Sequence, residues 1–144
     1  MHLTISTDPD LLDLDTLHRW LSEDAYWSRG RSHDVVERSV QGSLSFGAHD
    51  GDTFVGYARV VTDGATFAWL CDVYVEPTYR GRGVGTALLD AVTERLGELG
   101  VGRAMLATQD AHALYARYGF EPLAHPERWM GRSYGPATGP QATG

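Results

Sequence analysis

The order of hydrophobic and polar residues predicts a chain that begins with a short strand and two helices. Residues 2–6 form an apolar run that is typical of a strand. In residues 8–24 an Asp-Pro pair, which commonly opens a helix, precedes leucines at helical spacing: Leu11, Leu14, Leu17 and Leu21. Residues 33–43 show a second helical pattern that ends near Gly42.

The spacing of apolar residues then shortens to the alternation of β-strands. The runs 43–49 and 53–61 flank Asp50-Gly51-Asp52, a turn sequence that predicts a hairpin. Residues 66–75 predict a third strand of the same sheet. That strand ends before Pro77, because proline cannot donate a hydrogen bond to a neighbouring strand.

The rest of the chain alternates between helix and strand. Residues 83–100 place apolar side chains on one helical face: Val84, Leu88, Leu89, Val92, Leu96 and Leu99. We expect a strand at 103–108, a short helix at 110–119, a returning strand at 120–124 and an edge strand at 128–134. Antiparallel hairpins followed by one β-α-β crossover predict a mixed α/β domain over residues 1–134. Residues 135–144, mainly Gly, Pro, Ala and Thr, predict a disordered tail.

Composition narrows the classes of function. The chain has 12 arginines and no lysine against 19 acidic residues, and a net charge of −7 argues against a nucleic-acid partner. No apolar run approaches the ~18 residues of a membrane span, and no secretory signal is visible. The single Cys71 fits a reducing cytoplasm, so we expect a cytoplasmic protein without a membrane partner. The six histidines lack metal-ligand spacing, and no metal is expected.

Residues 79–86, YRGRGVGT, join the third strand to the long helix and suggest a phosphate-binding site. A glycine-rich turn at a helix start presents backbone N–H groups and the positive end of the helix dipole, and Arg80 and Arg82 add charge. A tight turn with solvated arginines would use the same residues. A nucleoside-triphosphate loop is excluded because it requires lysine. A dinucleotide site is disfavoured because Thr86 replaces its third glycine, although Asp110 stands where a ribose-binding acid would.

Two motifs resemble those of the GNAT N-acetyltransferase superfamily, in its small single-domain bacterial type. Arg80, Gly83 and Gly85 match its acyl-CoA signature, Gln/Arg-x-x-Gly-x-Gly/Ala. Residues 110–120, DAHALYARYGF, resemble its Ala-x-x-Leu-Tyr-x-x-x-Gly-Phe block, although Thr108 stands where the family often has asparagine. The resemblance covers roughly residues 2–134. It implies a mostly antiparallel sheet of six to seven strands, splayed at a central strand pair, with about four helices.

The resemblance also implies that acetyl-CoA is the cosubstrate. Its pantetheine arm would pair like a strand with the backbone of Val73 and Val75. Leu114 and Tyr118 of the second motif would complete the cofactor site. The pyrophosphate would bind the glycine-rich turn through Arg80, Gly81, Arg82, Gly83, Val84, Gly85 and Thr86.

Acetyl transfer needs an acid for the departing thiolate and a base for the acceptor amine. Tyr115 matches the acid position of the family, and a phenol with a pKa of about 10 is protonated at neutral pH. Asp72, the only charged residue in the strand 66–75, is the candidate base. An unpaired buried carboxylate is costly, so Asp72 could equally pair with an arginine such as Arg59. Acetylation of Cys71 is disfavoured, because no local motif places a base beside it.

Residues 23–33 correspond to a loop that often covers the acceptor in the family. Tyr26 and Trp27 could wall an apolar slot, while Arg29 and Arg31 could hold a carboxylate or simply be solvated. We expect direct transfer of an acetyl group to a primary amine of a small molecule in a ternary complex. The alternatives are a protein or peptide acceptor and an acyl-CoA sensor without catalysis. Exposed sheet edges would allow a homodimer.

Overall fold

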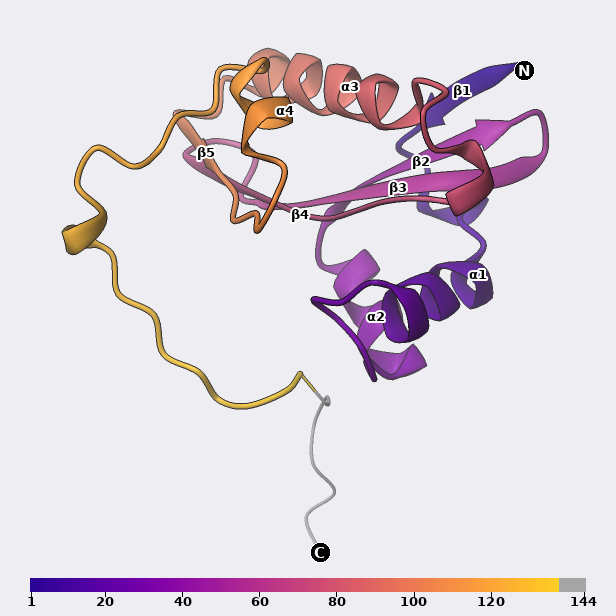
Figure 1. The fold of residues 1–144 in the computed structure, drawn as a ribbon, viewed down its shortest axis with the longest axis horizontal. Helices are drawn as coiled ribbons and strands as arrows, with labels where there is room; N and C mark the ends of the chain where they lie inside the picture. The colour runs from indigo at the N-terminus through magenta and orange to yellow at the C-terminus, as the bar shows by residue number, and fades with distance from the viewer. Residues whose placement is uncertain (138–144) are drawn as a thin grey trace, which may run out of the picture.

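The computed structural model describes residues 1–137, in which a five-stranded sheet lies between two helical layers (Figure 1). The strands follow one another across the sheet in chain order. The first four are antiparallel, and the fifth is parallel to the fourth. The strands are β1 (Leu3–Ser6), β2 (Leu44–Asp50), β3 (Thr53–Thr62), β4 (Phe67–Val75) and β5 (Arg103–Met105). The predicted hairpin and the β-α-β crossover are confirmed.

Four α-helices cover the sheet in the described residues: α1 (Leu14–Arg19), α2 (His33–Gln41), α3 (Val84–Leu99) and α4 (His112–Ala116). Helices α3 and α4 lie on one face, and α1 and α2 lie on the other (Figure 1). Single turns of 3-10 helix span Pro9–Leu11, Pro77–Tyr79 and Pro126–Arg128, and a π-helical turn, Trp20–Asp24, extends α1. None of the described helices is long and apolar enough to cross a bilayer.

The first helix begins later than the sequence predicted. The Asp8 side chain caps only the 3-10 turn, whereas Asp13 caps α1 by accepting a hydrogen bond from the Thr16 N–H group. Leu12 is extended between the two caps. Leu11 is 57% exposed and therefore adds nothing to the buried stripe, while Leu17 is fully buried. Without packing to support it, the first turn does not continue into the helix.

Two hydrophobic clusters hold the helices on the sheet. The first cluster joins α3 to the sheet and includes Phe46, Val55, Val60, Leu70, Val84, Leu88, Leu89, Val92 and Leu96. The second joins α1 and α2 to the opposite face and includes Leu17, Trp20, Leu21, Val36, Val40, Phe54, Tyr57 and Tyr74. The predicted apolar face of α3 is thus confirmed, with Leu99 only partly buried at its end.

The prediction of six to seven strands is wrong for residues 1–137, which form five. Segments 120–124 and 128–134, predicted as strands, form no strand in the described part of the chain, and β5 is shorter than predicted. An alternating pattern makes a segment able to pair, but pairing also requires a partner edge within reach. Residues 138–144 of the predicted tail lie outside the described residues.

Strand β4 loses its neighbour on the β5 side partway along its length. Phe67–Trp69 pair with Arg103–Met105, and β4 then continues to Val75 with β3 as its neighbour. The two parallel strands therefore separate after three residue pairs, at the edge of the five-stranded sheet and not at its centre. Within residues 1–137, no strand pairs with this edge of residues 70–75, near the start of α3.

Candidate active site

A β-bulge interrupts β4 at Asp72. Tyr57 of β3 pairs with Tyr74, but Arg59 pairs with Cys71, so two residues of β4 stand opposite one residue of β3. Asp72 has a φ of 50° and is the only non-glycine residue with positive φ in the described chain. Aspartate tolerates this left-handed conformation better than most residues.

The bulge reverses which side chains of β4 face each helical layer. Ala68 and Leu70 belong to the α3 cluster, so strict alternation would also turn residue 72 toward α3. Instead Val73 and Val75 pack against the α3 cluster, and Tyr74 joins the cluster under α1 and α2. The extra residue thus carries the Asp72 carboxylate to the face where the α1–α2 loop lies.

Three donors bind the carboxylate of Asp72, whose side chain is only 2% exposed. Trp27 Nε1 donates to Oδ1 at 2.9 Å, while Arg31 Nη1 and Arg59 Nε donate to Oδ2, each at 2.8 Å. Burial alone would raise the pKa of Asp72, but the two guanidinium groups outweigh burial and hold that pKa below its ordinary value. The sequence left open whether Asp72 is a general base or the partner of an arginine in a structural ion pair. This geometry favours the ion pair.

Cys71 lies beside this ion cluster and remains a thiol. Its burial raises the pKa of the thiol, and the attraction of Arg59 offsets this only in part. A cysteine nucleophile needs a lowered pKa, since the thiolate is the reactive form. The structure therefore offers no support for an acetyl-cysteine route.

The glycine-rich turn ends in an uncapped helix. Gly81 and Gly83 have φ values of 77° and 88°, and a Cβ at either would meet nothing within 4 Å. Backbone conformation, rather than lack of space, therefore requires glycine at both positions. Gly83 is the N-cap of α3 and provides no side-chain cap, so the first N–H groups of the helix have no such partner.

Gly85 has no comparable structural reason to be glycine. It lies in α3 with ordinary helical φ, and a Cβ there would stand 3.8 Å from Val75 Cγ2, an ordinary contact. Glycine inside a helix costs roughly 0.8–1 kcal/mol relative to alanine. Neither the backbone conformation nor the packing requires glycine at position 85. A glycine here is therefore consistent with close approach of a ligand.

The two arginines of the turn, Arg80 and Arg82, contact different residues. Arg80 bends back along β4, where its Nε donates to the Val75 carbonyl at 3.0 Å and its Nη2 lies 3.6 Å from Asp24 Oδ2. The Tyr74 hydroxyl donates to the same Asp24 carboxylate. Arg82 lies over the Tyr79 ring at 4.6 Å from its centre. Both arginines are exposed and add positive charge beside the start of α3.

Helix α4 is attached to the same end of α3. The Tyr118 hydroxyl lies 3.0 Å from Asp90 Oδ1 and 3.3 Å from the Thr86 carbonyl oxygen, both in α3. Leu114, Tyr115 and Tyr118 also pack against the α3 cluster. The second sequence motif is thereby placed next to the first.

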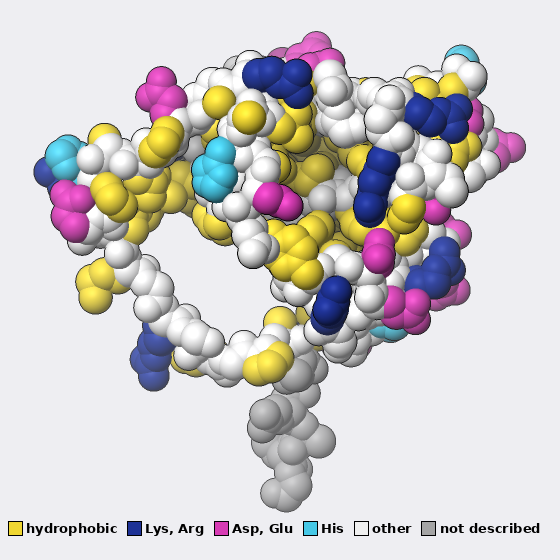
Figure 2. Space-filling view, viewed as in Figure 1, with side chains coloured by type: hydrophobic (Ala, Val, Ile, Leu, Met, Phe, Trp, Pro, Cys, Tyr) yellow, Lys and Arg dark blue, Asp and Glu magenta, His cyan; other side chains and the backbone are white. Residues whose placement is uncertain are grey.

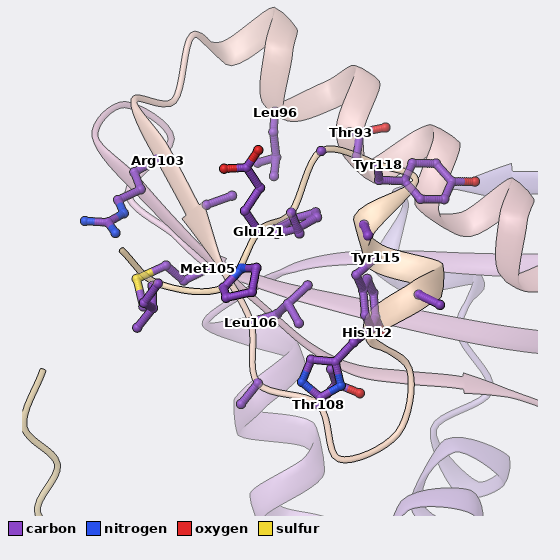
Figure 3. Close-up of a pocket in the computed structure, with 18 of the residues that line it drawn as sticks. Thr93, Leu96, Arg103, Met105, Leu106, Thr108, His112, Tyr115, Tyr118 and Glu121 are labelled. Atoms are coloured by element: carbon purple, nitrogen blue, oxygen red, sulfur yellow. The ribbon is translucent and has the colours of Figure 1, made fainter. Parts of the chain in front are cut away.

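Tyr115 projects from α4 into a cavity of about 990 Å³, toward Thr108 and His112 (Figure 3). Burial, and then the negative charge of Asp110, raise the pKa of its hydroxyl, which therefore stays protonated at neutral pH. That hydroxyl has no hydrogen-bond partner within residues 1–137. Tyr115 and Tyr118 line the cavity, whereas Val73, Val75 and the turn do not.

The predicted acceptor residues lie on the α1–α2 loop. Tyr26 and Trp27 are 51% and 42% exposed, and their rings meet edge to face at 5.1 Å between centres. Tyr26 also contributes to the raised pKa of Tyr115, so the two side chains are electrostatic neighbours. In Figure 2, hydrophobic side chains surround a hollow between the two helical layers. Arg29 is exposed, whereas Arg31 is held by Asp72.

Comparisons with known proteins agree with this geometry. The sequence model of the "Acetyltransferase (GNAT) family" matches residues 14–120, which include both motifs. A crystal structure of a GNAT-family protein from Xanthomonas campestris is 46% identical, with a TM-score of 0.89, and the match covers 92% of this chain and 94% of that one.

Two relatives in sequence carry acetyltransferase names. A Gibberella zeae protein is 33% identical over 133 residues, which is 78% of this chain and 75% of the relative. The bovine thialysine N-epsilon-acetyltransferase is 32% identical over 91 residues, 58% of this chain and 54% of its own length, so the match spans about half of that relative. The chain belongs to the GNAT acetyltransferase family.

Proposed function

We propose that this protein transfers an acetyl group from acetyl-CoA to a primary amine of a small molecule. Acetyl transfer follows from the family, which in general uses acetyl-CoA. The observation that supports the cofactor site in this chain is the open edge of β4 beside the uncapped, glycine-rich start of α3. A strand-like arm and a phosphate group would find backbone donors at these adjacent places.

The cofactor would bind mainly through backbone groups. The backbone of Val73 and Val75 faces the gap where β5 has left the sheet, which suits the pantetheine arm. The pyrophosphate would accept hydrogen bonds from the N–H groups of residues 81–86. Arg82 is available for a phosphate contact, whereas Arg80 would first have to leave the Val75 carbonyl and Asp24.

Tyr115 would serve as the acid. When the acceptor amine attacks the thioester carbonyl, a tetrahedral intermediate forms and its C–S bond breaks, and Tyr115 would protonate the departing sulfur. The raised pKa of its hydroxyl keeps that proton available at neutral pH. We assign Asp72 a positioning role, in which it holds Trp27 and Arg31 of the acceptor loop, and water would carry away the amine proton.

The acceptor would enter between the α1–α2 loop and α4. Tyr26 and Trp27 offer exposed aromatic surface there, and the net charge of −7 favours a cationic amine. The bovine relative is named for acetylation at the N-epsilon position of thialysine. We therefore favour a small amine over a protein acceptor.

A panel of amines tests this proposal directly. With acetyl-CoA and the full chain, free thiol should appear with small primary amines, and mass spectrometry should find the amine heavier by one acetyl group. Lysine-containing peptides should react more slowly than the best small amine. Saturable acetyl-CoA binding without thiol release on any amine would instead indicate the sensor alternative.

A matched pair of substitutions at Gly85 tests the cofactor site. Gly85→Ala should raise the free energy of unfolding by up to about 1 kcal/mol and leave acetyl-CoA binding intact, since the family signature accepts alanine there. Gly85→Leu should be similarly stable, but its side chain points toward the helix N-terminus and should occupy the phosphate position. We expect acetyl-CoA to raise the melting temperature of the alanine variant and not that of the leucine variant. Equal shifts in both would contradict the assignment.

A further inference from the structure

The ion cluster at the β-bulge carries more positive than negative charge. This cluster is Asp72 with Arg31 and Arg59, whose guanidinium groups share one carboxylate oxygen, Oδ2, each at 2.8 Å. Two titratable neighbours add no charge, because burial raises the pKa of the Cys71 thiol and raises the pKa of the Tyr57 hydroxyl to about 12. Two cations and one anion therefore leave the cluster with a net charge of +1.

The positive groups of the cluster reach the surface, whereas its carboxylate does not. The Asp72 side chain is 2% exposed, while the side chains of Arg31 and Arg59 are 16% and 15% exposed. The excess positive charge thus lies at the outer side of the cluster. A largely buried charge is costly unless it is paired. An anion that binds from outside would remove this cost.

Both guanidinium groups keep donors for such an anion. Arg31 binds Asp72 through Nη1, and its Nε and Nη2 have no acceptor within residues 1–137. Arg59 donates from Nε to Asp72 and from Nη1 to Ser43 Oγ, which leaves Nη2 without an acceptor in the same residues. Every buried side-chain nitrogen of the described chain has a hydrogen-bond partner, so these remaining donors are open to solvent. Planar guanidinium donors suit the two oxygens of a carboxylate.

Arg31 is held in place before any ligand binds. Its N–H group donates to the Ser28 carbonyl at 3.1 Å, and its carbonyl oxygen lies 3.0 Å from His18 Nε2. Together with the Asp72 contact, these interactions fix both the backbone and the end of the side chain. A side chain that is already fixed loses less entropy when it binds a ligand. The cluster is therefore rigid, unlike arginines that extend into solvent.

The cluster lies next to the proposed transfer site. Asp72 directly precedes Val73, whose backbone faces the proposed pantetheine arm, and both belong to the stretch of β4 that no longer pairs with β5. Trp27 donates to Asp72 Oδ1 and meets Tyr26 edge to face, and Tyr26 is an electrostatic neighbour of Tyr115. A small acceptor that lies between these aromatic side chains and β4 would meet the cluster with one end.

We propose that the acceptor amine also carries a carboxylate, as an amino acid does, and that Arg31 and Arg59 bind this carboxylate. The inference rests on the proposed acetyl transfer and narrows its acceptor from small primary amines to those with an anionic group. A single carboxylate matches the single excess charge of the cluster. The amine would attack the thioester while the bound carboxylate fixes the direction of attack.

Thermal unfolding tests the binding step without catalysis. The native chain with saturating CoA is unfolded with each of a panel of amino acids and, separately, with the matching amino-acid amides. The amides keep the amine and replace the carboxylate with a neutral group. At least one amino acid should raise the melting temperature more than its amide does. Equal shifts for every acid and its amide, or no shift with any of them, would overturn the proposal.

Steady-state rates then compare the acid and the amide of the best pair. In the native chain kcat/KM should be about 10- to 100-fold higher for the acid, the range for hydrogen bonds to a charged group. Arg31→Gln should remove most of this preference, mainly by raising KM for the acid. Arg38→Gln is the matched control, because Arg38 is an exposed arginine of α2 that lies near Asp34 instead; it should keep the preference. The ratio compares two substrates on one variant, so any loss of folded protein cancels.

The outcomes separate this inference from the proposed function. Thiol release that does not distinguish acid from amide would leave acetyl transfer standing and overturn the carboxylate site. A melting-temperature preference for the acid that requires Arg31, without thiol release on any amine, would support the carboxylate site and contradict acetyl transfer. An equal loss of preference in Arg31→Gln and Arg38→Gln would indicate a general effect of charge and would also overturn the site.

Discussion

Replacement of Asp72 by asparagine is expected to lower the free energy of unfolding by about 3–5 kcal/mol, the range for breaking a buried ion pair. Asparagine keeps the shape and can still accept from Trp27, but it leaves Arg31 and Arg59 without their shared negative charge. Thermal or urea unfolding of the variant at neutral pH measures the loss. If Asp72→Asn loses activity because the fold is destabilised, that activity should not return at high pH.

The pH dependence of stability provides a second readout of Asp72. Because its pKa is lowered in the folded state, ionised Asp72 stabilises the fold above the unfolded-state pKa of about 3.9. That contribution is lost as the pH falls through the lower, folded-state value. The difference in unfolding free energy between the native chain and Asp72→Asn should therefore be full at neutral pH and shrink in acid.

A double-variant cycle separates pairing from base catalysis. Asp72→Asn combined with Arg59→Gln should cost less than the sum of the two single changes, since the second change removes a cation that the first left unpaired. If Asp72 were also the general base, the rate of Asp72→Asn would recover as the acceptor amine deprotonates at high pH, whatever the stability of the variant. That outcome would reverse our assignment.

Substitution of Tyr115 by phenylalanine is expected to reduce kcat by about 100-fold or more, the usual contribution of a positioned acid. The change removes one hydroxyl that has no partner among the described residues, so the fold should be unaffected. Acetyl-CoA should still raise the melting temperature by the native amount, because the proposed phosphate and pantetheine contacts are made elsewhere. Steady-state kinetics and thermal shifts on the same sample measure both quantities.

The pH dependence of the native rate is a control for the Tyr115→Phe variant. The pKa of Tyr115 lies above its ordinary value of about 10. Tyr115 should therefore stay protonated at any pH below about 10, and the native rate should not fall in that range through loss of the acid. An unchanged kcat in the variant would mean that water or another group protonates the thiolate. Loss of acetyl-CoA binding along with activity would show that Tyr115 holds the cofactor instead.

Local sequence was sufficient to predict the parts of this protein that depend on neighbouring residues. The Asp50-Gly51-Asp52 turn, the apolar face of α3 and the glycine-rich turn are patterns of a few positions, and the structure contains each of them. The two motifs likewise indicate the family from residues within each motif, without any tertiary contact. In each case the backbone preferences and the periodicity act over a few residues, so the sequence alone determines them.

Tertiary structure decided the environment of Asp72 and the fate of the C-terminal segments. The sequence indicated that a lone acid in an apolar strand needs a partner, but Arg31 and Trp27 lie 41 and 45 positions away. They meet Asp72 because a bulge moves its side chain to the α1–α2 face. Segments 120–124 and 128–134 have strand patterns yet form no strands, because a strand is completed by a neighbouring edge. Such contacts depend on which distant residues the fold brings together, and local patterns do not specify that.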